Sequence, residues 1–293
     1  MVESMMKTNN HILVLGASGM LGNAVTRYFH QGAGYSITGA VRSKDSIDLF
    51  PLDLQDKIAW GVDADHFDTV RNFIKAERPG VVINCVGLVK QLSDINDPLV
   101  TLPINSLFPH KLARCCAEND ARLIHMSTDC VFSGSRGHYL EEEIPDAHDL
   151  YGVSKWLGEV SYPNAITLRT SIIGHELSGN RSLVDWFLSQ KISVKGFNNA
   201  IFSGLPTVEI ARIIKDYVIP NEKFSGVYHV SAEPISKYDL LNLVADIYSH
   251  DIEVIKDENL KINRSLDSSR FRSATGFFPA SWNEMIIKMR DFG

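Results

Sequence analysis

The sequence predicts an α/β fold, in which a doubly wound parallel sheet carries a smaller C-terminal α/β lobe. Three observations support this fold class. Short runs rich in β-branched residues alternate with segments of helical spacing in the first half of the chain. Three glycines follow the first of these runs at intervals of three residues. After about residue 171 the alternation gives way to a less regular pattern.

Five apolar runs in the first half are typical of buried strands, at 11–15, 35–41, 81–86, 122–127 and 165–171. The segments between them repeat apolar residues every three or four positions, as Leu21, Val25 and Tyr28 do. This alternation predicts right-handed crossovers and a parallel sheet with helices on both faces. Ligands of such sheets bind beyond the carboxyl ends of the strands.

The second half predicts helices at 182–190, 207–219, 237–248 and 282–290. One further strand is expected at 226–231, and another short apolar run lies at 252–255. No internal repeat, low-complexity tract or long linker interrupts this region. We therefore expect a second, smaller lobe.

The stretch GASGMLG, residues 16–22, follows the first strand. Gly16 can form the tight turn, Gly19 lets the backbone approach a pyrophosphate, and Gly22 lets the next helix pack close to the sheet. Free N–H groups at the helix start favour an anion. A glycine-rich loop without a ligand is the alternative, but the position after the first strand favours a dinucleotide.

We accordingly assign residues 8–171 to a Rossmann-type NAD(P)-binding domain, to which 207–231 is expected to return. Residues 172–293 are assigned mainly to a substrate-binding lobe. The first lobe uses its strand ends for the dinucleotide, so substrate specificity is expected from the second.

Two residues after the next strands bear on the choice of cofactor. Arg42 follows the second strand, where NAD-specific sites usually place an acid, and an arginine suits the 2′-phosphate of NADPH. A solvated surface arginine is the alternative. Asp63 follows a third, short strand and could accept a hydrogen bond from the adenine amino group, or lie in an exposed loop. NADPH is therefore favoured over NADH.

The catalytic chemistry is predicted from STDCVFSG at 127–134 and YGVSK at 151–155. Tyr151 and Lys155 are four residues apart and share one helical face. The lysine ammonium is expected to lower the pKa of the tyrosine, which could then exchange a proton with a carbonyl oxygen. Thr128 offers a hydroxyl to the same oxygen. A surface pair without a catalytic role is the alternative.

Composition excludes several other functions. The chain has 293 residues, 44% of them hydrophobic, and a net charge of -6 without a basic stripe, so no nucleic acid is expected as a partner. Four cysteines form no CxxC pair, and no metal site is expected. The polar start of the chain has no signal-peptide pattern, and no apolar run is long enough to span a membrane. A cytoplasmic protein is expected.

These motifs, together with LDSSRF at 266–271, resemble the extended short-chain dehydrogenase/reductases. Within them the chain is most similar to the dTDP-4-dehydrorhamnose reductase group, and the resemblance covers nearly its whole length. It implies NADPH-dependent reduction of the 4-keto group of a nucleotide-linked 6-deoxy sugar, in the synthesis of a deoxysugar for surface polysaccharide. The expected partner is the nucleotide sugar, and the sequence is compatible with a homodimer.

The resemblance also implies roles for individual residues. The catalytic triad would be Thr128, Tyr151 and Lys155. Cofactor-binding positions would be Gly16, Ser18, Gly19, Met20, Leu21, Gly22, Arg42, Asp63, Val86, Gly87, Asn105, Tyr151 and Lys155. Substrate-binding positions would be Thr128, Asp129 and Arg169, which stands near the end of the strand at 165–171. Arg181 and Arg270 are candidates for the diphosphate.

Two residues depart from the sequence pattern of this group, and two other functions are alternatives to reduction. The group usually reads STDYVFDG, whereas this chain has Cys130 and Ser133, which leaves the identity of the sugar open. A regulatory subunit on the same fold, like that of methionine adenosyltransferase, is one alternative, and the intact triad favours an enzyme. An epimerase or dehydratase is the other. A dehydratase usually has an acid where Cys130 stands, which argues against that reaction.

Overall fold

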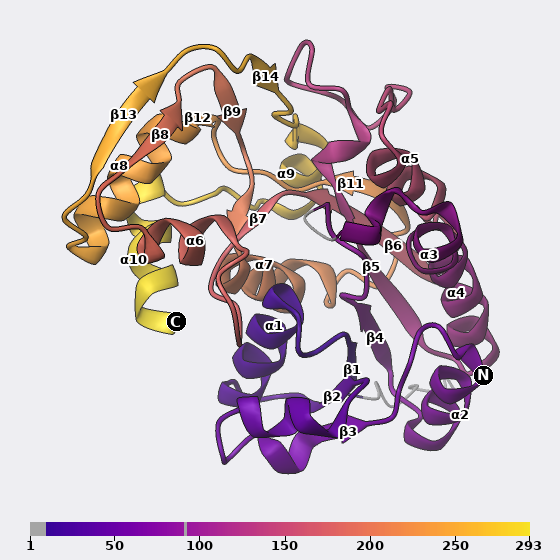
Figure 1. Ribbon diagram of the computed structural model, residues 1–293. Coiled ribbons are helices and arrows are strands. Elements are labelled where there is room, and N and C mark those ends of the chain that lie inside the picture. The colour runs from indigo at the N-terminus through magenta and orange to yellow at the C-terminus, as the bar shows by residue number, and fades with distance from the viewer. Residues whose placement is uncertain (1–9, 91–92) are drawn as a thin grey trace.

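The computed structural model describes residues 10–90 and 93–293 and is built around a seven-stranded parallel sheet (Figure 1). Its strands in chain order are β1 (His11–Leu15), β2 (Ser36–Val41), β3 (Ile58–Trp60), β4 (Val81–Asn84), β5 (Arg122–Thr128), β6 (Ala165–Thr170) and β11 (Gly226–His229). Their spatial order is β11-β6-β5-β4-β1-β2-β3. The chain reverses its direction of travel across the sheet between β1 and β4, so a ligand-binding switch point lies there.

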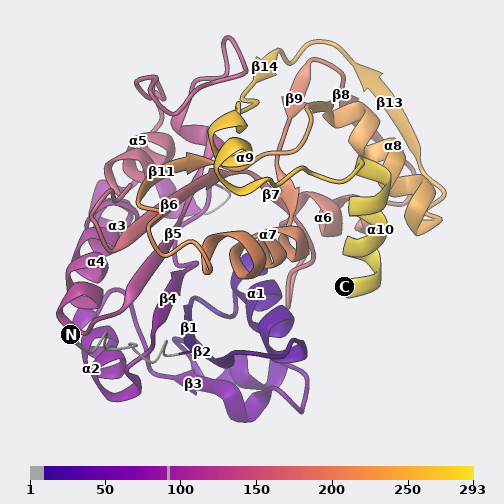
Figure 2. The same ribbon diagram turned by 180° about the vertical axis from the view of Figure 1, so that it is seen from behind.

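Side chains of β1 alternate between two separate cores. Ile12 and Val14 face a core that includes residues of α1 (Met20–Gln31) and α7 (Thr207–Ile213). Leu13 and Leu15 face the other, which α2 (Phe67–Glu77) and α4 (Phe108–Glu118) cover. Figures 1 and 2 show these two helical layers on opposite faces of the sheet. A strand buried on both faces needs apolar residues at consecutive positions, which is why HILVL predicts it.

The remaining helical segments of the first lobe are short. They comprise η1 (Lys44–Leu49), η2 (Gln55–Lys57), η3 (Ser93–Asn96), α3 (Pro98–Leu102), η4 (Pro103–Leu107), η5 (Asp129–Val131) and α5 (Leu150–Leu157). η4 is a π turn that continues into α4. The doubly wound parallel sheet predicted from the sequence is confirmed.

The second lobe has a core of its own, which lies away from the large sheet (Figure 2). Its helices are α6 (Leu183–Ser189), α8 (Lys237–Tyr248), α9 (Ser269–Thr275) and α10 (Trp282–Phe292). Its strands are β7 (Ile172–Ile173), β8 (Ser193–Phe197), β9 (Ala200–Phe202), β10 (Leu205–Pro206), β12 (Ile235–Ser236), β13 (Glu253–Asp257) and β14 (Ile262–Asn263). They form small sheets of two or three strands.

Several elements in the second half of the sequence differ from the prediction. The helix expected at 207–219 is divided into α7 and a π turn, η6 (Ile214–Val218). The strand expected at 226–231 is β11, which ends at His229 and pairs in parallel with β6. Strands β8, β9 and β10 were not predicted. The domain boundaries stay a prediction, and residues 8 and 9 of the first domain lie outside the described residues.

Two features of the described residues bear on membrane and metal binding. Within 10–90 and 93–293, no helix is long and apolar enough to cross a membrane. Across the same ranges, no three His, Cys, Asp or Glu side chains are grouped so as to hold a metal ion. Residues 1–9, in which we predicted no targeting signal, lie outside the described part of the chain.

Candidate active site

The glycine loop after β1 forms a cradle that side chains would fill. Gly16 has a φ of +75°, and a Cβ on Gly22 would lie 2.1 Å from the carbonyl oxygen of Gly16. Gly19 is the N-cap of α1, and no side chain caps this helix start. The N–H groups of the first turn are therefore left to an external acceptor, which fits a pyrophosphate. Ser18 and Met20 are partly buried, whereas Leu21 belongs to the core.

A second loop follows β4 at the switch point. Asn105, from η4, accepts a hydrogen bond from Leu88 N at 2.8 Å and donates to Leu88 O at 3.2 Å. Asn84 Oδ1 accepts from Val86 N at 3.1 Å. A Cβ on Gly87 would lie 3.5 Å from Asn105 Oδ1 and 3.7 Å from Lys155 Nζ. The predicted cofactor residues Val86, Gly87 and Asn105 therefore lie together beside the lysine.

Helix α5 is pressed directly against the end of β5. Asp149 is its N-cap and accepts from Gly152 N at 2.8 Å. A Cβ on Gly152 would lie 2.3 Å from Cys130 O, so only glycine allows this approach. The same geometry brings Tyr151, in the first turn of the helix, to Thr128. Lys90 forms an ion pair with Asp149 at 2.8 Å and links the loop after β4 to this helix start.

Two members of the predicted triad, Thr128 and Tyr151, lie together at the carboxyl end of β5. Burial raises the pKa of Tyr151, and Cys130 and Asp129 act in the same direction, while a hydrogen bond with Thr128 opposes them. Lys155 is buried, donates from Nζ to Met126 O at 2.8 Å, and has its pKa lowered by burial to about 8. The expectation that Lys155 lowers the tyrosine pKa is therefore wrong for this structure, because desolvation dominates. A tyrosine that stays protonated at neutral pH is suited to donate a proton.

Asp129 is buried next to Thr128, and two cations of the second lobe influence its pKa. Burial raises its pKa, whereas Arg264 and, more weakly, Lys237 act to lower it. Arg264 donates from Nε to Phe132 O at 2.7 Å, which holds it over the end of β5. Sequence analysis missed both cations. The only signal for Arg264 is its place two residues before LDSSRF, and nothing marks Lys237.

Arg169 lies within β6, the strand that the sequence predicts at 165–171. Its buried guanidinium donates to Glu159 at 2.7 Å and 2.6 Å and to His229 Nε2 at 3.1 Å. With these partners it has no free face for a substrate, so we do not retain it as a substrate ligand. Burial and the charge of Arg169 lower the pKa of His229 to about 3.

The other predicted positions lie at the rim or beyond it. Arg42 is exposed after β2, and its carbonyl accepts from Gly61 N at 3.2 Å. Asp63 accepts from Asp65 N at 3.1 Å and contacts His66 at 3.2 Å, so its carboxylate caps a local turn. Arg270 lies over the Tyr228 ring and 3.9 Å from Glu142. Arg181 is exposed.

The family described as RmlD substrate binding domain matches residues 10–291. The chain belongs to this family. The dTDP-4-dehydrorhamnose reductase of Aggregatibacter actinomycetemcomitans is 23% identical over 96% of the chain and 98% of that protein. Methionine adenosyltransferase 2 subunit beta of Danio rerio is 26% identical over 81% of the chain and 74% of that protein.

Solved structures of similar proteins have the same fold. A hypothetical dTDP-4-dehydrorhamnose reductase from Sulfolobus tokodaii superimposes with a TM-score of 0.76 and 24% identity, covering 93% of the chain and 98% of that structure. The dTDP-4-dehydrorhamnose reductase of Bacillus anthracis in complex with NADP gives a TM-score of 0.78 at 18% identity, covering 97% of the chain and all of that structure.

Membership of the RmlD substrate binding domain family confirms two predictions from the sequence. One is the resemblance to the extended short-chain dehydrogenase/reductases of the dTDP-4-dehydrorhamnose reductase type. The other is the enzyme class, an NAD(P)-dependent oxidoreductase of this type. The glycine cradle agrees with this class, because its close approaches leave the start of α1 open to a dinucleotide.

Proposed function

We propose that this protein uses NADPH to reduce the 4-keto group of a nucleotide-linked 6-deoxy sugar, in the synthesis of a deoxysugar for surface polysaccharide. One observation carries the proposal: α5 brings Tyr151 to Thr128 at the carboxyl end of β5, and Lys155 of the same helix donates to Met126 O of that strand. The full-length similarity to a protein named dTDP-4-dehydrorhamnose reductase supports this choice of substrate. We place the reaction in the cytoplasm.

The proposed chemistry adds one hydride and one proton to a carbonyl group. The nicotinamide cofactor, when bound, supplies the hydride to the carbonyl carbon. Thr128 donates a hydrogen bond to the carbonyl oxygen, and Tyr151 transfers its phenolic proton to that oxygen, which yields the alcohol. Lys155, whose ammonium group lies beside Gly87, would bind the cofactor and offset the charge that forms on the tyrosine.

The preference for NADPH rests on the end of β2. Arg42 is exposed there, and Lys44 lies over the ring of Trp60 at 5.8 Å, so two cations flank the place where a 2′-phosphate would bind. Asp63 remains our candidate for the adenine. We expect Arg42→Ala to weaken NADPH by about 1.5–3 kcal/mol and NADH much less. Equal losses for the two cofactors in fluorescence titrations would show that Arg42 does not bind the phosphate.

The substrate diphosphate needs cations at the mouth of the site. Arg264 and Lys237 face Asp129, so we now propose them for this role alongside Arg270. Arg181, in the loop before α6, remains a prediction from sequence. Residues 172–293 would thus supply most substrate contacts, as proposed for the second lobe. We also keep the homodimer as a proposal.

Two other functions remain to be separated from reduction. A regulatory role is suggested by the similarity to methionine adenosyltransferase 2 subunit beta, but the assembled Thr128, Tyr151 and Lys155 favour a catalyst. An epimerase would regenerate its cofactor and show no net NADPH consumption. The test is NADPH oxidation against a panel of nucleotide-linked 4-keto-6-deoxy sugars. Steady oxidation with a member of the panel supports the proposal, and none with any member refutes it.

A further inference from the structure

Four buried polar side chains form a continuous chain across the sheet. Ser127 donates to Glu159 Oε1 at 2.7 Å, and Glu159 also binds Arg169 at 2.7 Å and 2.6 Å. Arg169 then donates to His229 Nε2 at 3.1 Å. This hydrogen-bonded chain of side chains crosses β5, β6 and β11 and begins at Ser127, the residue next to Thr128. None of its members has a role in the proton transfer proposed above.

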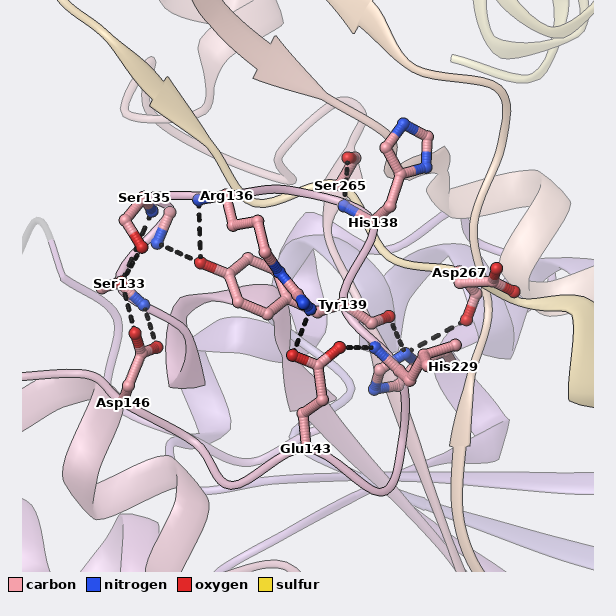
Figure 3. Close-up of polar contacts among 12 residues, drawn as sticks. Ser133, Ser135, Arg136, His138, Tyr139, Glu143, Asp146, His229, Ser265 and Asp267 are labelled. Carbon is pink, nitrogen blue, oxygen red and sulfur yellow. Dashed lines mark hydrogen bonds and ion pairs between the residues drawn. The ribbon is translucent and has the colours of Figure 1, made fainter.

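The far end of this hydrogen-bonded chain reaches two segments, 133–146 and 262–268. His229 Nδ1 lies 3.0 Å from Tyr139 O and 3.2 Å from Asp267 O, and its main-chain N–H donates to Glu141 at 2.8 Å. Because Nδ1 faces carbonyl oxygens it must carry the proton, and Nε2 is then the acceptor for Arg169. Figure 3 shows His229 between Tyr139 and Asp267.

We name the segments 133–146 and 262–268 the covering loops. Main-chain hydrogen bonds join them, from Tyr139 N to Ser265 O at 3.0 Å and from Asp267 N to Tyr139 O at 2.9 Å. A Cβ on Gly137 would lie 2.2 Å from Asn263, so the loops are in close contact. The second covering loop also carries Arg264, which faces Asp129.

Stability alone does not explain why such a chain is buried. Desolvation of Arg169 and Glu159 costs about as much as their attraction returns, so a buried ion pair is weak evidence for a stabilising role. Its hydrogen bonds nevertheless fix the relative positions of the groups that they join. These groups are the end of β5 beside Thr128 and the two segments that His229 contacts.

We propose that Arg169 and His229 are positioning residues that couple the covering loops to the strand end carrying Thr128. The proposal rests on the proposed function, because the site that they position is the reductase site. Closure of the covering loops around a substrate would then be transmitted to Thr128 through hydrogen bonds of fixed geometry. Displacements of about 1 Å at a reacting group can cost about a hundredfold in rate.

The test compares two substitutions of one residue. His229→Leu removes both hydrogen-bonding nitrogens, whereas His229→Gln keeps an acceptor and a donor. His250→Leu is the control, because His250 packs against Phe187 in the second-lobe core, 5.5 Å between ring centroids, and does not belong to the chain. For each variant, kcat, KM, NADPH affinity and amide hydrogen exchange at 127–130 are measured. If His229→Leu does not fold, Arg169→Lys replaces it in the test, because the lysine keeps a positive charge beside Glu159.

We expect His229→Leu to lower kcat about 10- to 100-fold with NADPH affinity unchanged, and to speed exchange at 127–130. His229→Gln should recover most of both effects, and the control should show neither. Equal impairment in the leucine and glutamine variants, or exchange at 127–130 that stays at the wild-type rate, would overturn the proposal. If the proposed reductase function is wrong, the wild-type protein itself shows no reductase activity. The hydrogen exchange at 127–130 then tests the coupling by Arg169 and His229 without the kinetic data.

Discussion

At the scale of single residues, the proposed proton donor is a tyrosine that remains neutral. Burial raises the pKa of Tyr151, so its phenol is protonated across the physiological range and available as a donor. The YxxxK spacing places Tyr151 and Lys155 on one face of α5 but does not predict the direction of this pKa shift, because desolvation depends on residues brought in from other elements. Cys130 and Asp129 raise the pKa of Tyr151 only because Gly152 lets α5 approach them.

Replacement of the proton donor is the first prediction at this scale. Tyr151→Phe keeps the ring and removes the hydroxyl, so kcat should fall at least about 100-fold while NADPH affinity stays nearly unchanged. Steady-state kinetics and a cofactor titration measure the two effects. Tyr162→Phe is a matched control, because the Tyr162 hydroxyl contacts only His110 among the described residues, at 2.9 Å. Full turnover in Tyr151→Phe would remove the tyrosine from the mechanism.

Lys155 should carry a stability cost that depends on pH. Its pKa in the folded protein is about 8, against 10.5 for an unperturbed lysine, so the cost is complete below pH 8 and is relieved as the pH rises toward 10.5. Lys155→Met should therefore raise the free energy of unfolding at pH 7 by about 2 kcal/mol, after allowance for the lost bond to Met126. The gain should shrink by pH 10. Urea unfolding at both pH values measures it, and a destabilised variant at pH 7 would contradict the account.

At the scale of elements, local patterns predict the large sheet well and the second lobe poorly. The runs HILVL and RLIHMS become β1 and β5, because strands buried on both faces require continuous apolar residues. Strand β8 pairs with β13 from a distant part of the sequence, and its buried residues alternate with exposed ones over only five positions. Such a strand has too short an alternating pattern to be predicted from the local sequence. The Arg169–His229 contact was likewise missed, because it depends on the register of two strands.

The glycine cradle gives a prediction that separates folding from binding. Gly22→Ala places a Cβ 2.1 Å from Gly16 O and should cost about 1–3 kcal/mol of stability. Gly19→Ala meets only Gly16 O, at 3.4 Å, so it should fold normally but weaken NADPH by blocking the approach of the pyrophosphate. Thermal unfolding and cofactor titration give the two readouts. Normal NADPH affinity in Gly19→Ala would argue against the predicted pyrophosphate site.

At the scale of the whole molecule, we propose that the first lobe binds the cofactor and that the second lobe supplies most contacts with the substrate. The large sheet presents the glycine cradle and the triad at its carboxyl edge, and the second lobe brings Arg264 and Lys237 to the same place. A nucleoside diphosphate such as dTDP should therefore protect amides after residue 171 from hydrogen exchange, whereas NADP+ should protect the loops after β1 and β4. Protection by dTDP confined to the first lobe would refute this division.

The central claim, that hydride passes from NADPH to a nucleotide-linked keto sugar, is tested most directly by isotope transfer. The protein is incubated with NADPH deuterated on the transferred face of nicotinamide C4 and a nucleotide-linked 4-keto-6-deoxy sugar, and the product is analysed by mass spectrometry and NMR. The account predicts an alcohol with one deuterium on sugar C4, formed in step with NADPH oxidation and suppressed at least about 100-fold in Tyr151→Phe. Recovery of the keto sugar unchanged, or a sugar epimerised without deuterium, would contradict it.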